Sequence, residues 1–405
     1  MSAAAGALER AYRDERAAVL ATLTRRLDGD LALAEDVVQD AFVAAAVDWE
    51  RRGAPERPGA WLTTTAWRKA LDRLRHDRVA AALSVPDMPM SSELEYDDSS
   101  LEDDQLAMLF GCCHPALNPE ARMALTLRSV AGLTVPEIAR AFLSTEVAME
   151  RRLGRARHKV SNARIPVSVP SDDLLPERLA GVLRVVYLIY TEGHTATRGA
   201  AAVRGDLCEE AIRLARLLVR LMPDESEARG LLALLLLTDA RRAARAGADG
   251  ALVALAEQDR TLWDAGRIAE GRALIRGLPG PYLIQAAIAA LHAEAGSWEA
   301  TDWPQIAALY AQLERHDPSP VVTVNRAVAV GFAEGPAAGL ALLDAVAGDE
   351  RLARYQPLHA ARAELLARAG EHAAADAAYE LAIALTENEA TRAALAARRT
   401  AAGRS

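Results

Sequence analysis

The sequence predicts an all-α protein, and three observations support that prediction. Alanine and leucine, which are among the strongest helix formers, dominate the composition. Apolar residues recur at helical spacing, and few stretches have the alternating Val, Ile and Thr pattern of strands. Hydrophobic residues make up 51% of the 405 residues, which is enough for cores in two to four domains of about 100–200 residues each.

Composition also limits the class of protein. The N-terminal segment carries scattered charges and lacks the apolar core of a signal peptide. The longest apolar run, Gly230 to Leu237, is shorter than the roughly 20 residues that cross a bilayer. Three cysteines are too few for a disulfide framework. We therefore expect a cytoplasmic protein with reduced thiols and no membrane partner.

The first predicted domain covers residues 7–80, with breaks at Asp28–Asp30 and Arg51–Gly59. Within it, Leu31–Glu50 has the pattern of an amphipathic helix. We expect its inward face to consist of Val37, Val38, Ala41, Phe42 and Ala45. Its outward face is acidic with one amide, and consists of Glu35, Asp36, Gln39 and Asp40. Taken alone, such a face also fits an ordinary solvated helix.

The next helix, Pro58–Arg75, combines aromatic and basic residues. The residues expected to face the core are Trp61, Leu62, Thr65 and Leu71 or Leu74. The basic side carries Trp67, Arg68, Lys69, Arg73 and Arg75. Trp67 fits either packing or a contact with DNA. An acidic helix face followed by a basic aromatic helix suggests two macromolecular partners.

The net charge of −9 conceals a strong segregation of charge. Between Asp87 and Asp104 there are eight acids and no base, in a stretch rich in Pro and Ser, so we expect an acidic linker over residues 81–103. From Arg151 to Arg164 the chain is basic and has no acid. This local asymmetry indicates a nucleic-acid surface.

The second predicted domain, residues 104–163, contains a helix-turn-helix. Thr134 and Glu137 have the spacing of a capping box, and residues 143–145 form the turn. In the second helix one buried stripe is expected at Met149, Leu153, Ala156 and Val160. The DNA-facing set is Thr145, Ala148, Arg151, Arg152, Arg155 and Lys159. A helix that is buried on one side and cationic on the other fits the major groove, although a solvated basic helix has the same pattern.

After a breaker at residues 164–176, paired amphipathic helices are expected over residues 177–402. Gly335 and Gly370 occupy equivalent turns between helices, 35 positions apart. That period fits helical hairpins of the tetratricopeptide kind, at about 34 residues each. An irregular helical bundle is the alternative.

Together these segments resemble the extracytoplasmic-function type of sigma-70 factor, the promoter-recognition subunit of bacterial RNA polymerase. AEDVVQDAF is similar to the family's polymerase-binding helix, and PGAWLTTTAWRKALDRLR to its −10 element helix. GLTVPEIARAFLSTEVAMERRLGRARHK is similar to its −35 helix-turn-helix. LFGCCHPALNPEARMALTLRSVAGLT and the helical tail resemble the subgroup with a fused tetratricopeptide-like extension.

The resemblance implies partners for each set of residues. Asp36, Gln39 and Asp40, with Glu35 beside them, are expected to dock on the coiled coil of the largest polymerase subunit. The polymerase flap region and promoter DNA are the other implied partners. The linker would thread the polymerase cleft, where its acids either imitate nucleic-acid charge or are simply solvated. Many relatives have a basic residue at Trp67, often Asn at Arg68 and a hydroxyl residue at Ala148, so base recognition does not transfer.

The remaining constellations indicate neither a metal site nor catalysis. Cys112 and Cys113 are adjacent on a helix, where their side chains diverge by about 100°, and neither has a C-x₂-C partner. No phosphate-loop, dinucleotide or hydrolase motif is present. We expect no cofactor, metal or catalytic residue, and a tail that regulates the factor by binding a ligand or protein. The alternative is a helix-turn-helix regulator that acts without polymerase.

Overall fold

The structure is a computed structural model that describes residues 3–80, 98–142, 144–163, 165–195, 203–245, 247, 252–277 and 279–403. Helices joined by turns account for these ranges and no strand occurs in them, so the all-α prediction is confirmed. The chain divides into two compact units, Met1–Val186 and Tyr187–Ser405. No helix in the described ranges has both the length and the apolar character that crossing a membrane requires.

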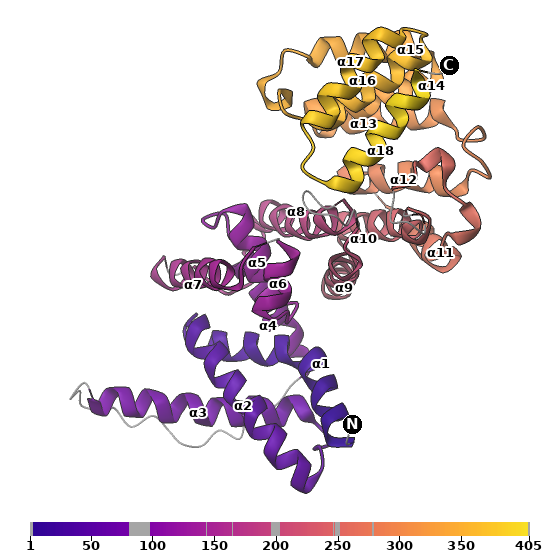
Figure 1. The fold of residues 1–405 in the computed structure, drawn as a ribbon. Helices are drawn as coiled ribbons and strands as arrows, with labels where there is room; N and C mark the ends of the chain where they lie inside the picture. Colours follow the sequence, from indigo (N-terminus) through magenta and orange to yellow (C-terminus); the bar gives the residue numbers. More distant parts are fainter. Residues whose placement is uncertain are drawn as a thin grey trace. The chain divides into compact units, whose positions relative to one another are not determined.

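The first three helices form the first domain of the first unit (Figure 1). They are α1 (Ala3–Arg26), α2 (Leu31–Arg52) and α3 (Pro58–Ala80), and each packs on the other two. The predicted break before α2 is a tight turn in which Asp28 and Gly29 have positive φ, and Asp30 caps the helix by accepting from the Leu33 amide at 3.0 Å. The five residues expected to face inward from α2 are buried, which confirms that prediction.

The core side of α3 differs in part from the prediction. Leu62 is fully buried, and the rest of the stripe is formed by Ala66 and Ala70 rather than by Thr65 and the later leucines. The Trp61 ring packs edge-on against the buried Trp49 ring at 5.7 Å between centroids. Small alanines at the crossing let α3 lie close to its neighbours, which a leucine stripe would prevent.

Four helices follow in the same unit: α4 (Asp98–Cys112), α5 (Pro119–Ser129), α6 (Val135–Ala141) and α7 (Glu146–Asn162). The predicted linker, residues 81–103, is therefore too long at its C-terminal end, because α4 begins at Asp98. Helix α4 packs on α1 as well as on α5, so the helix is stabilised by tertiary contacts that its acidic composition conceals. Residues 81–97 of that linker lie outside the described ranges.

Helix α8 (Leu175–His194) begins inside the predicted second linker and crosses the boundary between the units. Its N-terminal half belongs to the first unit. There Arg178 donates from Nη2 to the carbonyl oxygen of Phe110 in α4 at 2.7 Å. The second linker is thus shorter than predicted by two residues, and the start of α8 contributes to the first unit.

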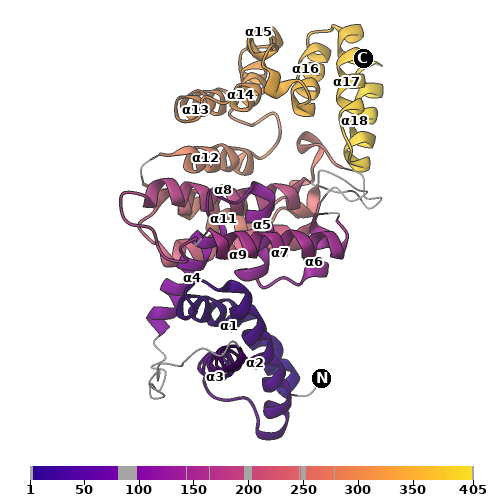
Figure 2. The same cartoon turned by 90° about the vertical axis from the view of Figure 1, so that its left-hand side faces the viewer.

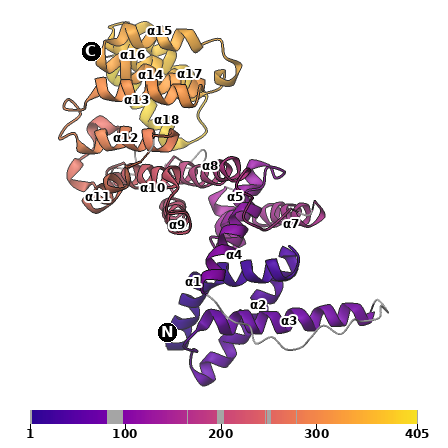
Figure 3. The ribbon, with the colours of Figure 1, turned by 180° about the vertical axis from the view of Figure 1, so that it is seen from behind.

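The second unit is a succession of helices, each packed on the next (Figures 2 and 3). Its helices are α9 (Gly205–Leu221), α10 (Ser226–Asp239), α11 (Ala265–Leu274), α12 (Pro281–Glu294), α13 (Trp303–His316), α14 (Pro320–Ala333), α15 (Pro336–Val346), α16 (Gln356–Arg368), α17 (His372–Ala384) and α18 (Glu389–Ala402). Successive apolar clusters join α12 to α14, α14 to α16, and α16 to α18. The core therefore runs along the unit, as in stacked helical pairs.

Glycine allows the last hairpins to form. Gly335 and Gly370 have positive φ, 108° and 79°, in the turns between α14 and α15 and between α16 and α17, as the sequence predicts. Gly339 lies where α15 crosses α14. A Cβ atom there would approach the carbonyl oxygen of Ala327 to 2.5 Å and the side chain of Leu365 to 2.8 Å.

Gly339→Ala is expected to destabilise the second unit by about 1–3 kcal/mol, because the added methyl overlaps a backbone atom that cannot yield without moving a helix. Gly348→Ala is the matched control, since a Cβ atom at Gly348 has no neighbour within 4 Å. Chemical denaturation of both variants measures the effect. Equal stabilities for the two variants would contradict the close approach of α14 and α15.

Candidate nucleic-acid interface

The basic face of α7 is held outward by local features that the sequence predicts. Thr134 and Glu137 form the capping box of α6, with the Thr134 amide donating to the Glu137 carboxylate at 2.6 Å. Thr145 caps α7 by accepting from the Ala148 amide at 3.2 Å. The predicted stripe of α7 is at most 3% exposed at each of its four positions. With that side buried, the opposite side faces solvent.

The predicted DNA-facing residues share that solvent-exposed side. The five exposed residues are Thr145, Ala148, Arg151, Arg155 and Lys159. Arg152 is half-buried and forms an ion pair with Glu120 at 3.0 Å. Arg152, Arg155 and Lys159 line an open hollow of about 630 Å³ beside the segment 115–122. A concave cationic surface of this kind fits a phosphate backbone. Val147, which the sequence reasoning omitted, is 59% exposed at the start of α7.

Helix α3 presents its basic residues less uniformly. Arg68 and Arg75 are exposed, and Lys69, Arg73 and Trp67 are half-buried. The guanidinium of Arg26 lies over the ring of Trp67 at 5.7 Å from its centroid. The ring of Trp67 is therefore partly accessible to solvent and lies beside the positive charge of Arg26.

The structure corrects the expected orientation of Glu35. This residue is only 6% exposed and does not belong to the outward face of α2. Its Oε2 accepts from Nη1 of Arg157 in α7 at 2.6 Å, and its Oε1 lies 3.5 Å from the Ser129 hydroxyl and 4.0 Å from Nε of Arg128. The partners come from 94 and 122 positions along the chain, so no local pattern encodes the burial of Glu35.

The other three residues of the predicted acidic face lie outward. Gln39 is exposed, and the carboxylates of Asp36 and Asp40 both accept from Arg73 of α3, at 3.2 and 2.7 Å. Arg73, from the predicted −10 surface, thus neutralises Asp36 and Asp40 of the predicted polymerase-binding surface. Because these side chains are 40–65% exposed, such pairs contribute about 0–1 kcal/mol and exchange readily with a partner.

An apolar continuation of this face was missed by the sequence reasoning. Val43 and Val47 of α2 are 61% and 52% exposed. The spacing of Asp36, Asp40, Val43 and Val47 places them on one stripe of the helix. Large exposed apolar residues in such a row are the signal of a docking surface.

A second contact joins the two domains of the first unit. The carboxylate of Asp104 in α4 is 4% exposed and accepts from the Thr22 hydroxyl at 2.8 Å and from Nε of Arg25 at 2.5 Å, both in α1. Nη1 of the buried Arg16 donates to the carbonyl oxygen of Arg128 at 2.9 Å. The sequence groups Asp104 with the acids that either imitate nucleic-acid charge or are solvated. In the structure it is buried instead, and its charge docks α4 on α1.

The cysteines of the sequence motif are part of the core. Cys112 is the last residue of α4 and Cys113 follows it; both are buried, and Sγ of Cys113 contacts the Thr126 hydroxyl at 3.5 Å. Burial raises the pKa of the Cys113 thiol to about 11. Both side chains therefore act as small apolar groups at neutral pH.

Comparison with known protein families identifies three segments. Residues 11–79 match the profile of sigma-70 region 2, and residues 107–160 match that of sigma-70 region 4. Residues 178–278 match DUF6596, a family of unknown function. The first two matches coincide with α1–α3 and with α4–α7, so the described surfaces fall within the matched segments.

Known proteins resemble the chain over different lengths. It is 45% identical over 373 residues to the uncharacterized protein R00370 of Rhizobium meliloti (strain 1021), which covers 89% of this chain and 87% of that protein. It is 31% identical over 138 residues to the RNA polymerase sigma factor CnrH of Cupriavidus metallidurans, with 31% of this chain and 71% of CnrH covered. It is 40% identical over 98 residues to the ECF RNA polymerase sigma factor SigL of Mycobacterium tuberculosis, with 24% of this chain and about half of SigL (55%) covered. No solved structure matches the chain.

Glu35→Gln is expected to lower the stability of the first unit by about 1–3 kcal/mol, because the arginines that face the buried carboxylate lose its charge. Glu120→Gln is the matched control. Glu120 is 62% exposed in its pair with Arg152, and its loss should cost less than about 0.5 kcal/mol. Urea denaturation followed by circular dichroism measures both variants. An unchanged midpoint for Glu35→Gln would show that the domains are not held by this pair.

Proposed function

The chain belongs to the sigma-70 family of RNA polymerase sigma factors, the proteins of transcription initiation, and from this premise we propose how its surfaces divide the work. The exposed stripe of α2 docks on the polymerase core, α3 contacts the −10 element, and α7 contacts the −35 element. The observation that carries this proposal is that exposed acidic and cationic helix faces lie within the two matched regions in the family's order.

The polymerase contact rests on the stripe Asp36, Asp40, Val43 and Val47, with Gln39 beside it. Carboxylates orient the partner through basic side chains, and the two valines add apolar area that becomes buried on docking. A coiled coil on the largest subunit, which offers a row of alternating basic and apolar side chains, is the proposed partner. The polymerase flap is proposed as the contact of the region 4 domain.

Promoter contacts follow from the two basic helices. The start of α7, with the exposed Val147 and Ala148, would meet base edges, including the methyl group of thymine. Arg151, Arg155 and Lys159 follow at phosphate positions. On α3, Arg68 and Lys69 would track the backbone of the −10 strand, and Trp67 offers a ring for a base, worth roughly 1–3 kcal/mol for each base stacked.

The contact between α2 and α7 is proposed to be a closed state of the free chain. The two promoter elements lie about 25 base pairs apart, which is roughly 85 Å at 3.4 Å per base pair. Two touching domains of about 60 residues have centres only about 30 Å apart. The pair between Glu35 and Arg157 must therefore break before both elements are bound together.

The tail, from α8 onward, is proposed to regulate the factor in cis, either by masking promoter-binding helices or by adding a polymerase contact. Its stacked hairpins, with glycine turns 35 positions apart, support a tetratricopeptide-like character. A polymerase-independent regulator has no need of the docking stripe on α2. The exposure of Val43 and Val47 therefore favours the sigma factor over that alternative.

Asp40→Lys is expected to weaken binding to core polymerase by at least tenfold, because it reverses a charge at the centre of the docking stripe. Asp48→Lys is the matched control. It makes the same charge change on α2 at a position about 80° around the helix from Asp40 and about 110° from the centre of the stripe. Fluorescence anisotropy with labelled chain and core enzyme measures affinity. Equal affinities for the two variants would contradict docking through this stripe.

Ending the chain after Val186, at the boundary between the units, is expected to change promoter-dependent transcription in vitro. Activity rises if the tail masks the DNA helices and falls if the tail adds a polymerase contact. This cut keeps the contact of Arg178 with α4. A cut at Ser168 would remove that contact as well as the tail, so its effect could not be assigned to the tail alone. Cooperative thermal unfolding verifies the shortened chain. Transcription and polymerase affinity equal to those of the full chain would contradict regulation by the tail.

A further inference from the structure

A cavity of about 260 Å³ lies within the second unit, and none of its lining residues belongs to the surfaces discussed above. Its wall is formed by α8, by α10 and the segment that follows it as far as Trp263, and by α12, α13 and α14. The residues that matter for its chemistry are Tyr187, Arg241, Trp263, Ile288, His292 and Tyr310. The cavity therefore combines a cation with aromatic and aliphatic walls.

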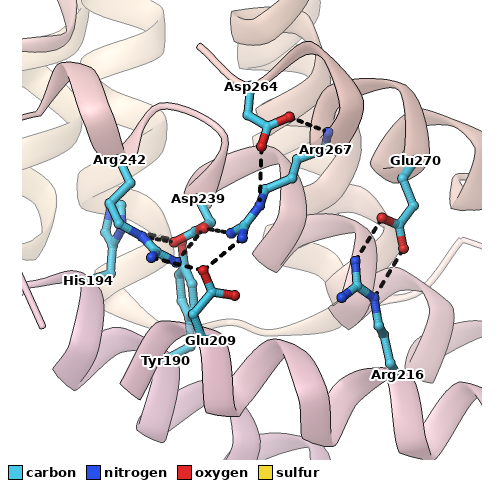
Figure 4. A network of polar contacts seen from close by, with 9 residues as sticks. All are labelled: Tyr190, His194, Glu209, Arg216, Asp239, Arg242, Asp264, Arg267 and Glu270. Atoms are coloured by element: carbon cyan, nitrogen blue, oxygen red, sulfur yellow. Dashed lines mark hydrogen bonds and ion pairs between the residues drawn. The ribbon is translucent and has the colours of Figure 1, made fainter. Parts of the chain in front are cut away.

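The cation of this cavity lacks a counter-charge. Arg241 has no hydrogen bond or ion pair from its side chain to any residue that the structure describes. Two other arginines of this unit show the contrast (Figure 4). Arg242 and Arg267 both donate to the buried carboxylate of Asp239, and both also donate to the carboxylate of Glu209, at 3.0 and 2.7 Å. The unit thus supplies acids for the arginines on one side of α10 and none for Arg241.

Arg241 is half-buried, and this partial burial makes its unpaired charge costly. Desolvation, together with the nearby positive charge of Arg245 and Arg260, lowers the pKa of Arg241 to about 10. The group remains cationic at neutral pH. Arg260 is engaged in part: its Nη1 donates to the carbonyl oxygens of His292 and Ala295 and its guanidinium lies 4.4 Å from the Trp263 ring centroid, whereas its buried Nη2 has no partner. An uncompensated buried charge destabilises a fold, and a bound anion would remove that cost.

Two further residues of the wall carry polar atoms with unused hydrogen-bonding capacity. Trp263 Nε1 and His292 Nδ1 are buried and have no hydrogen-bond partner in the structure. Burial and the arginines lower the pKa of His292 to about 4, so the ring is neutral at pH 7. Neutral imidazole and indole N–H groups add hydrogen bonds without adding charge. Arg241 is thus the charged residue of the cavity lining, and the positive charges of Arg245 and Arg260 lie close behind it.

We propose that this cavity binds a small organic monocarboxylate. The guanidinium of Arg241 accepts the carboxylate through paired N–H donors, Trp263 and His292 supply neutral hydrogen bonds, and the apolar body lies against Ile288 and Tyr310. A single cation favours a monoanion over phosphate. The volume is slightly below that of drug-sized sites, so the ligand is small. The site is inferred from the cavity and does not depend on the role proposed for the tail in transcription.

Saturation-transfer NMR on the full chain tests the proposal with phenylacetate and with phenylacetamide, its neutral isostere, at constant ionic strength. Phenylacetate should receive saturation and raise the thermal midpoint by about 2–4 °C at 20 mM, as expected for millimolar affinity. Phenylacetamide should do neither. Equal responses to the acid and the amide would overturn the proposal.

Arg241→Met should abolish the preference for the acid and leave the ligand-free midpoint unchanged or higher, because the variant removes an unpaired buried charge. Arg216→Met is the matched control, since Arg216 is a surface arginine paired with Glu270 at 2.8 Å. This variant should respond like the unaltered chain. Retained acid preference in Arg241→Met, or a ligand-free midpoint lowered by more than about 4 °C, would overturn the proposal.

A second pair of variants locates the apolar body of the probe. An adjoining cavity of about 290 Å³ shares Arg241 but is lined by Arg245, Gln258 and Ala394. Ala289→Leu narrows the aromatic cavity and should weaken the phenylacetate signal at least fivefold. Ala394→Leu narrows the adjoining cavity and should leave the signal unchanged. The reverse result would overturn the assignment to the aromatic cavity.

Discussion

The buried carboxylate Glu35 ties α2 to region 4 and, with the contact of Asp104 on α1, joins the two regions of the first unit. It lies on α2, whose apolar face forms the core of region 2 and whose exposed stripe is the proposed polymerase contact. Its ion pairs come from region 4, from Arg157 of α7 and Arg128 of α5, and the buried Arg16 of α1 adds a further positive charge nearby. A buried acid without a cation is strongly unfavourable. The position of α7 relative to α2 is therefore set by electrostatics, and the apolar stripe of α7 remains free to form the region 4 core.

Compensation of buried charge also organises the second unit. Asp239 has a side chain that is 1% exposed, and two arginines from different elements converge on it. This cluster joins the end of α10 to α9 and α11. Arg241 lies two positions after Asp239 in the sequence, and no described carboxylate pairs with its guanidinium. The same chemistry that makes Asp239 structural makes Arg241 available to a ligand, because a fold retains an unpaired buried charge only at a cost in stability.

The sequence allowed the fold to be predicted wherever neighbouring residues decide the structure. The stripe of α7, its cap at Thr145, the capping box of α6 and the glycine turn at Gly335 all depend on residues a few positions apart. The prediction failed at Glu35 and Asp104, whose partners lie 79 to 122 positions away. It also failed at Val43 and Val47, because an exposed valine and a buried one have the same local pattern. The surfaces for polymerase and DNA remain predictions, and the structure adds their exposure and their charge partners.

The closed contact has an energetic consequence for promoter search. If separating the two regions costs about 3 kcal/mol, roughly one free chain in 150 is open, and the apparent affinity for a full promoter falls by the same factor. The proposed polymerase contact lies on the exposed stripe of α2, which is accessible in the closed state, whereas the proposed closed state prevents simultaneous binding of both promoter elements. Docking would thus come first, and the exchange of Arg73 from Asp36 and Asp40 to a partner is inexpensive because these pairs are solvent-exposed. Polymerase contacts of region 4 can then offset the loss of the Glu35 pair. In the proposed closed state, the fold of the free chain would suppress its occupancy of promoters, and the regulation proposed for the tail would require a shift of this equilibrium by only a few kcal/mol.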